Sequence, residues 1–209
     1  MLLGSVCPIC GRRGAAPCRS CLARLVPCGA LTPPCGVARA AALLRYQGAG
    51  RELVARLKYH NARGALDWLA RGMAGLIDAD PPPAVICWVP TTTERRRARG
   101  FDQAELLARA VARQRGASAM PLLVRRRGPA QTGRDARHRA EGPALACRAW
   151  ESVPAGARVL VVDDVITTGA SISAAARVLR SAGAAEVSAL AAAHTPPRAD
   201  LPSPDLPSA

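Results

Sequence analysis

Short apolar runs alternate with polar loops and amphipathic stretches along the chain. Residues 85–90 (VICWVP) and 159–162 (VLVV) are continuous apolar runs, which is typical of strands buried on both faces of a parallel sheet. Each run is followed by a polar loop and then by an alanine- and leucine-rich stretch that ends before a glycine. We therefore expect helices over residues 101–115 and 170–182.

These elements form two strand–loop–helix–strand units. The first closes with a strand at residues 120–124 (MPLLV), and the second spans residues 159–190. Two such units in succession predict an α/β fold with a parallel, doubly wound sheet, in which the loops after the strands share one edge. A strand at residues 38–46 and a helix over residues 51–64 are expected to precede them.

The 209 residues are enough for one such domain and a small appendage. The chain divides by composition into a cysteine-rich module (1–36), an α/β domain (37–194) and a Pro-rich tail (195–209) that we expect to be disordered. Aromatic residues make up only 3%, so alanine, valine and leucine must fill the core. No apolar stretch approaches the roughly 18 residues of a membrane span or resembles a signal peptide, which favours a cytoplasmic protein.

Positive charge is concentrated in one part of the chain. The net charge is +14, and Lys58 is the only lysine among 29 basic residues. Residues 94–140 hold 13 arginines against four acidic residues, which gives this segment a net charge of +9. Such a surface attracts phosphates or nucleic acid. A GC-rich genome is an alternative source of so strong a preference for arginine and alanine.

Two adjacent carboxylates, Asp163 and Asp164, follow the apolar run at 159–162. Hydroxyl groups and a glycine come next, in a loop that leads into a helix: Thr167, Thr168, Gly169 and Ser171. Backbone N–H groups at a helix N-terminus suit a phosphate, whereas two carboxylates suit sugar hydroxyls or a metal-associated sugar. A phosphorylated ribose satisfies both halves. The alternatives are a solvated surface turn and the magnesium site of a receiver domain, but only 45 residues follow Asp164, too few for a receiver.

The stretch DDVITTGAS resembles the phosphoribosyl pyrophosphate (PRPP) fingerprint of type I phosphoribosyltransferases. The resemblance implies the fold of that family and PRPP as ligand, bound with magnesium. It also implies that Asp163 and Asp164 hold the ribose 2′- and 3′-hydroxyls, while the Thr-Thr-Gly loop wraps the 5′-phosphate.

Six of the eight cysteines lie within residues 7–35. Two CxxC pairs separated by seven residues predict a closed tetrahedral zinc site with a structural role; the ligands are Cys7, Cys10, Cys18 and Cys21. A segment this short and poor in bulky apolar residues buries little core, so we expect the metal to fold the module and its loss to unfold the module alone. Coincidental reduced cysteines are the alternative, and Cys28 and Cys35 remain possible substitutes or neighbours.

From Cys7 to about residue 193 the chain resembles the ComF family, in which a cysteine zinc module precedes a phosphoribosyltransferase-like domain. The family often carries a third CxxC pair, of which Thr32 here replaces the first cysteine. This departure favours the first two pairs as ligands. The resemblance implies a cytoplasmic PRPP-binding protein that handles single-stranded DNA together with other DNA-uptake proteins in natural transformation (competence).

Two further segments resemble family motifs. The loop after residue 90 and the motif RGFDQA (99–104) resemble the pyrophosphate loop, with Thr92, Arg95 and Arg99 as candidate ligands; the alternative is an exposed basic turn. Lys58, in a Leu-Lys-Tyr triplet, is a candidate point charge toward phosphate or else a solvated helix lysine.

Residues 125–142 take the place of the flexible catalytic loop of these enzymes. Gln131 and Arg139 match the family's spacing, so Arg137 and Arg139 are the catalytic candidates. Gly142 stands where relatives often have asparagine, which bears on catalysis more than on ligand binding.

Three functions are compatible with these features. The first is a transferase with an unidentified acceptor; an amidophosphoribosyltransferase would need a glutaminase domain, which this sequence lacks. The second is the ComF-type role with DNA. The third is a PRPP-sensing regulator that binds the ligand without reaction.

Overall fold

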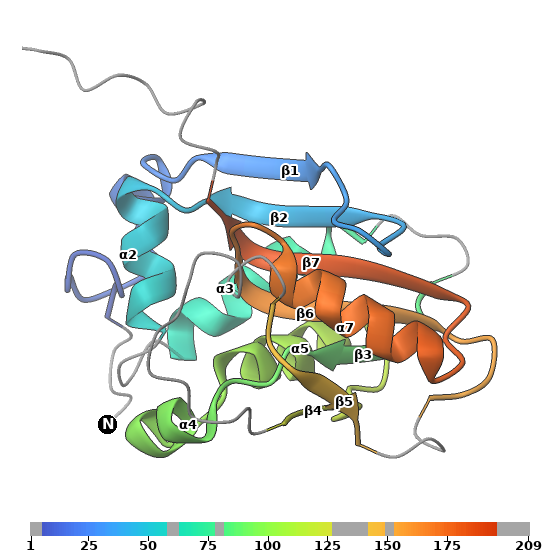
Figure 1. Cartoon of the computed structure of the whole chain (residues 1–209). Coiled ribbons are helices and arrows are strands. Elements are labelled where there is room, and N and C mark those ends of the chain that lie inside the picture. Colours follow the sequence, from blue (N-terminus) through green and yellow to red (C-terminus); the bar gives the residue numbers. More distant parts are fainter. Residues whose placement is uncertain (1–5, 58–62, 78–81, 127–141, 149–152, 196–209) are drawn as a thin grey trace, which may run out of the picture.

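A five-stranded sheet forms the centre of the protein (Figure 1), with strand order β1-β2-β7-β6-β3. The structure is a computed structural model that describes residues 6–57, 63–77, 82–126, 142–148 and 153–195. The strands are β1 (Pro27–Leu31), β2 (Ala40–Arg45), β3 (Val85–Trp88), β6 (Arg158–Ile166) and β7 (Glu186–His194). β1 is antiparallel to β2, and the other pairs are parallel. The predicted α/β fold with a mainly parallel sheet is therefore confirmed.

Helices cover both faces of the sheet (Figure 1). The larger ones are α2 (Gly48–Arg56), α3 (Arg63–Ala74), α5 (Gln103–Arg115) and α7 (Ala170–Ser181). Leu53, Leu69 and Leu107 from the first three pack into one core, whereas Ile172 and Leu179 of α7 belong to a second core. Both cores are built mainly from alanine, valine and leucine, as the composition predicts.

The strand that carries the acidic pair is longer than predicted. The apolar run was expected to end at residue 162 and give way to a polar turn, but β6 continues to Ile166. Its pairing with β7 extends through Asp163↔Ala191 to Ile166↔His194. Small alanines of β7 lie opposite this end of β6. Asp163 and Asp164 therefore belong to a paired strand and not to a turn.

The strand expected at 120–124 does not enter the main sheet. Residues 118–120 run beside β3, where Ile86 N–H donates to Ser118 O at 3.0 Å and Met120 N–H donates to Ile86 O at 2.9 Å. Pro121 follows and has no N–H to continue the ladder. The chain then forms β4 (Leu123–Arg125), which pairs antiparallel with β5 (Leu145–Cys147) in a separate two-stranded sheet.

The helix predicted over 51–64 is also revised. α2 begins three residues earlier and ends at Arg56, and the sequence did not predict α3. α3 packs so closely against β2 that a Cβ on its Gly72 would come within 2.8 Å of Leu43 Cδ2. Within the described ranges, α1 (Arg19–Leu22) and α4 (Thr93–Arg99) are short helices.

The cysteine-rich segment is joined to the domain in two ways. Its strand β1 is an edge strand of the main sheet. In addition, Cys7, Ile9 and Cys21 are buried in the same core as Leu53 of α2. The segment therefore shares the core of the α/β domain, although its composition predicted a module that depends on metal alone.

Candidate functional site

The acidic pair lies at the carboxyl end of β6, half-buried. Asp163 Oδ1 accepts the backbone N–H of Asp164 at 2.8 Å, and Asp164 Oδ1 accepts that of Val165 at 2.8 Å. Burial, and then the charge of Asp164, raise the pKa of Asp163 well above its ordinary value. A ligand that brings hydroxyl donors or a cation to this pair relieves that unfavourable charge.

The loop after β6 has the geometry of an anion cradle at the start of α7. Gly169 caps the helix in the left-handed conformation at φ 76°, and Thr168 Oγ1 accepts the N–H of Ala170 at 3.4 Å. Thr167 and Thr168 are exposed and Ser171 is half-buried in the first helical turn. These hydroxyls and N–H groups therefore lie together at the positive end of the helix dipole.

Gly169 is also the point where the N-terminal part of the chain covers this loop. A Cβ on Gly169 would lie 2.6 Å from Pro34 Cγ, so the position has room only for glycine. Nearby, Arg180 Nε of α7 donates to Gly36 O at 3.2 Å. The segment from Pro34 to Gly36 is therefore held against both the loop and its helix.

The arginine-rich loop after β3 folds into the short helix α4. Thr92 caps it, and its Oγ1 accepts the N–H of Arg95 at 3.2 Å. None of the residues of α4 is buried. Arg95 is exposed, whereas Arg99 is half-buried and donates through Nη1 to Gln103 Oε1 at 3.1 Å. The loop thus presents several guanidinium groups, and that of Arg99 is hydrogen-bonded to the first residue of α5.

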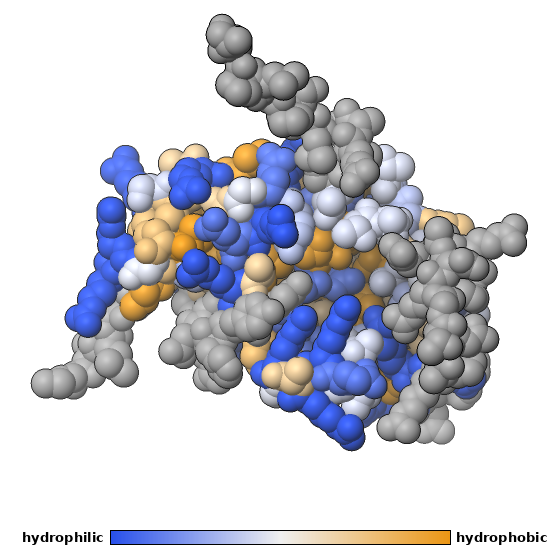
Figure 2. All heavy atoms as spheres, turned by 60° about the vertical axis from the view of Figure 1, so that its left-hand side comes forward, coloured by the Kyte–Doolittle hydropathy of each residue, from blue (hydrophilic) through white to orange (hydrophobic). Residues whose placement is uncertain are grey.

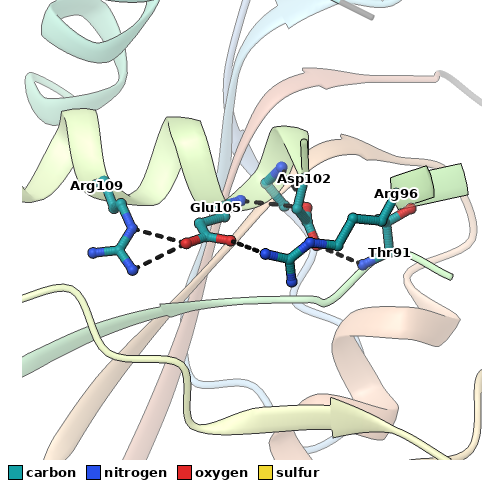
Figure 3. A network of polar contacts seen from close by, with 6 residues as sticks. Thr91, Arg96, Asp102, Glu105 and Arg109 are labelled. Atoms are coloured by element: carbon teal, nitrogen blue, oxygen red, sulfur yellow. Dashed lines mark hydrogen bonds and ion pairs between the residues drawn. The ribbon is translucent and has the colours of Figure 1, made fainter. Parts of the chain in front are cut away.

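The first turn of α5 holds this loop in place (Figure 3). Asp102, which is buried, accepts the N–H of Thr91 at 2.8 Å as well as the N–H groups of Ala104 and Glu105. Glu105 Oε2 in turn lies 3.9 Å from Arg96 Nη2, and Glu105 Oε1 lies 3.0 Å from Arg109 Nη2. Burial raises the pKa of Asp102. Its role is to cap α5 and to fix the backbone that leads into α4.

Arg125 is held at the start of the arginine-rich loop and lies near Asp163, and sequence reasoning missed it. Its Nε donates to Pro90 O at 2.9 Å, at the start of the arginine-rich loop. Burial lowers its pKa, and the nearby charge of Asp163 opposes that change. Sequence reasoning assigned Arg125 to the polar segment 125–142. Its position directly after the apolar residues 122–124 was a signal that it belongs to the ordered part of the fold.

Gly142 lies against the first turn of α7. It has φ 75°, and a Cβ there would come within 2.5 Å of Ala170 O. The backbone at this position therefore leaves no room for a larger residue such as asparagine. Arg137, Arg139 and Lys58 lie outside the described residues, so their roles remain predictions.

Four cysteines of the N-terminal segment converge as predicted. The Sγ atoms of Cys7, Cys10, Cys18 and Cys21 all lie within 4.8 Å of one another. The Sγ atoms of Cys10 and Cys18 are 3.7 Å apart. A tetrahedral zinc ion with Zn–S bonds of about 2.3 Å needs its sulfur ligands about 3.8 Å apart. The cluster therefore fits such an ion. Cys28 and Cys35 are not part of it; Cys28 lies on β1 and Cys35 is exposed near Pro34.

The thiols of this cluster differ in acidity. The Ser20 hydroxyl, 3.3 Å from Cys18 Sγ, is the main cause that lowers the pKa of Cys18 to about 6. Burial and the neighbouring thiols raise the pKa of Cys21 to about 12. Four thiolates at this spacing thus require a cation.

Residues 103–204 match the model of the phosphoribosyl transferase domain family. This match makes that part of the chain similar to phosphoribosyltransferase domains. Together with the mainly parallel sheet, it gives the type I phosphoribosyltransferase fold that the sequence predicted. The matched segment contains the acidic pair and the loop around Gly169, and it starts just after the arginine-rich loop.

A curated protein is similar to part of the chain. An adenine phosphoribosyltransferase of Parafrankia sp. (strain EAN1pec) is 36% identical over 121 residues, which cover 58% of this chain and 55% of that protein. The chain therefore spans about half the length of this relative.

Solved phosphoribosyltransferases resemble the chain over part of its length. Glutamine PRPP amidotransferase from B. subtilis is 24% identical, with a TM-score of 0.44, and the match covers 63% of this chain and 27% of that one. Adenine phosphoribosyltransferase from Leishmania tarentolae is 19% identical, with a TM-score of 0.44 and coverage of 78% and 68%.

Proposed function

We propose that the chain binds PRPP with magnesium at the carboxyl edge of its sheet. The observation that carries this proposal is the acidic pair at the end of β6, followed directly by the glycine-capped N-terminus of α7. Carboxylates for ribose hydroxyls and donors for a phosphate lie next to each other in the order in which a ribose phosphate needs them.

Each part of PRPP has candidate ligands in this chain. Asp163 and Asp164 receive the ribose hydroxyls. The 5′-phosphate is assigned to Thr167, Thr168, Gly169 and Ser171. The pyrophosphate is assigned to Thr92, Arg95 and Arg99, to which we add Arg125 and, as a prediction, Lys58. Guanidinium groups suit this part because they donate pairs of hydrogen bonds to phosphate oxygens.

A transfer reaction at this site displaces pyrophosphate from the anomeric carbon by an acceptor amine or base. The magnesium ion supplies charge neutralisation for the pyrophosphate when it is bound. The chain holds the ribose ring through the acidic pair and fixes the leaving group through the arginines, while Arg137 and Arg139 are the candidates for stabilising its developing charge.

Calorimetry and a turnover assay test this function. We expect PRPP with magnesium to bind more tightly than ribose 5-phosphate, because only PRPP engages the arginine-rich loop. Pyrophosphate release should then be measured with adenine, since the curated relative is named for that base. Release identifies a transferase, and binding without release with any base identifies a sensor or accessory protein. Absence of PRPP binding overturns the proposal.

A ComF-type role with single-stranded DNA in the cytoplasm, alongside DNA-uptake proteins, is the second candidate. It is favoured by the exposed arginines, which include Arg95, Arg96 and Arg97 on α4 and Arg12, Arg13 and Arg24 near the cysteine cluster. Figure 2 shows hydrophilic side chains projecting in separate groups with apolar surface between them. None of the described helices has the length and apolar character needed to cross a bilayer.

Binding of single-stranded DNA is expected to be mainly ionic, because aromatic residues for base stacking are few. Four engaged arginines predict that log K falls with log salt at a slope near −3, from about −0.7 per phosphate contact. Reversing the charge of Arg12, Arg13 and Arg24 should flatten the slope, whereas Asp163→Asn should leave it unchanged. Gel-shift titrations across salt measure this. A protein that retards no DNA at low salt does not have this role.

A further inference from the structure

We infer that Gln103 is a positioning residue for the pyrophosphate part of the site, because it holds the guanidinium of Arg99 in the orientation that receives a phosphate. This inference rests on the proposed binding of PRPP. It assigns a function to a side chain that is not among the residues proposed above to bind PRPP.

The contact between the two side chains is specific in its direction. Gln103 is the first residue of α5 and is only 5% exposed. Arg99 Nη1 donates to Gln103 Oε1 at 3.1 Å. A guanidinium group can only donate hydrogen bonds, so this contact fixes which end of the Gln103 amide faces Arg99.

The other end of the amide has no partner. Gln103 Nε2 is buried without an acceptor among the residues that the structure describes. A buried donor without an acceptor destabilises a protein, whereas an apolar side chain of the same shape does not. Methionine has nearly the same length and would fill this space without that penalty. Gln103 therefore makes the folded protein less stable than methionine would, while its Oε1 holds Arg99. Such a loss of stability is expected where a residue serves function.

The position of Arg99 explains what that oxygen achieves. Arg95, Arg96 and Arg97 of α4 are exposed, but Arg99 lies half-buried at the end of the helix, next to Gly100. A free arginine must lose rotamer freedom when it binds a phosphate, and an arginine already held loses less. Gln103 therefore prepares one arginine of the loop before the ligand arrives.

The test compares Gln103→Met with a matched control, Gln114→Met. Gln114 lies on the same helix but is exposed, and its amide donates to Asp67 Oδ1 at 3.1 Å. We expect Gln103→Met to weaken binding of PRPP with magnesium about tenfold, the scale of one charge-assisted hydrogen bond. Binding of ribose 5-phosphate should not change, and the melting temperature should stay equal or rise. Gln114→Met should leave both affinities unchanged.

A double-mutant cycle with Arg99→Ala shows whether Gln103 acts through Arg99. In the Arg99→Ala background, Gln103→Met should produce no further loss of PRPP affinity. An equal loss for ribose 5-phosphate, an additive effect in the cycle, or unchanged PRPP binding overturns the inference. If methionine lowers the melting temperature, Gln103→Leu removes the same oxygen with a different shape and must give the same affinity pattern. A wild-type protein that does not bind PRPP overturns the proposed function itself, which is a distinguishable result.

Discussion

Replacing Asp163 and Asp164 together by asparagine is expected to weaken PRPP binding by about 100-fold or more while the protein stays folded. The size follows from losing two charged acceptors, each of which contributes about 1.5–3 kcal/mol to a hydrogen bond with a ligand. The fold should survive because both side chains are only half-buried and their backbone pairing with β7 does not depend on the carboxylates. Calorimetry with PRPP, and circular dichroism for the fold, measure the two effects.

The pH dependence of stability is an internal control for this variant. The pKa of Asp163 is raised in the folded protein. As the pH rises above about 4, this carboxyl group therefore loses its proton in the unfolded chain before it does so in the folded protein. Ionisation then favours unfolding, and the contribution of Asp163 to stability falls until the pH passes its folded pKa. The double asparagine variant should lack this fall and be at least as stable at neutral pH. If it is folded and binds PRPP normally, the acidic pair is not part of the ligand site.

Replacing Cys10 by serine is expected to release the metal and to destabilise the whole protein. The cysteine segment shares its core with α2 and α5, so unfolding is not confined to the module as the sequence suggested. The melting temperature should fall by roughly 10 °C or more, since each kcal/mol shifts it by about 2–4 °C in a chain of this size. Metal analysis and thermal denaturation measure the two effects.

Cys35→Ser is the matched control for this experiment, because Cys35 is exposed and outside the cluster. It should keep one zinc per chain and the wild-type melting temperature. Protein purified without oxygen that contains no metal would rule out the zinc site. A Cys10→Ser protein that loses zinc but melts like the wild type would show that the metal does not support the shared core.

The parts of the fold that sequence reasoning identified are those in which a short run of residues determines its own structure. The apolar run before Asp163, Gly116 at the end of α5 and Gly183 just after the end of α7 are signals of this kind. The extension of β6 to Ile166 depends on the alanines of β7 that pair with it, which lie 28 residues further along the chain (Asp163↔Ala191, Val165↔Ala193). β1 was missed because Pro27, Cys28 and Gly29 have little strand preference, and its structure depends on pairing with β2.

The candidate site shows the same division. The residues of the loop after β6 are contiguous, so their chemistry is visible in the sequence. Arg125 and Gln103 act through partners on other elements or loops, namely Pro90 and Arg99. Neither contact follows from residue type or spacing, because each depends on how the chain folds back on itself.

The way Pro34 lies on Gly169 links two regions that differ in composition. A shortened chain that begins at residue 37 would lose this proline together with β1. The phosphate loop would then open on one side, and β2 would expose a row of unpaired backbone groups to other molecules. A shortened version of this protein therefore has to retain the cysteine-rich segment, for solubility as much as for ligand affinity.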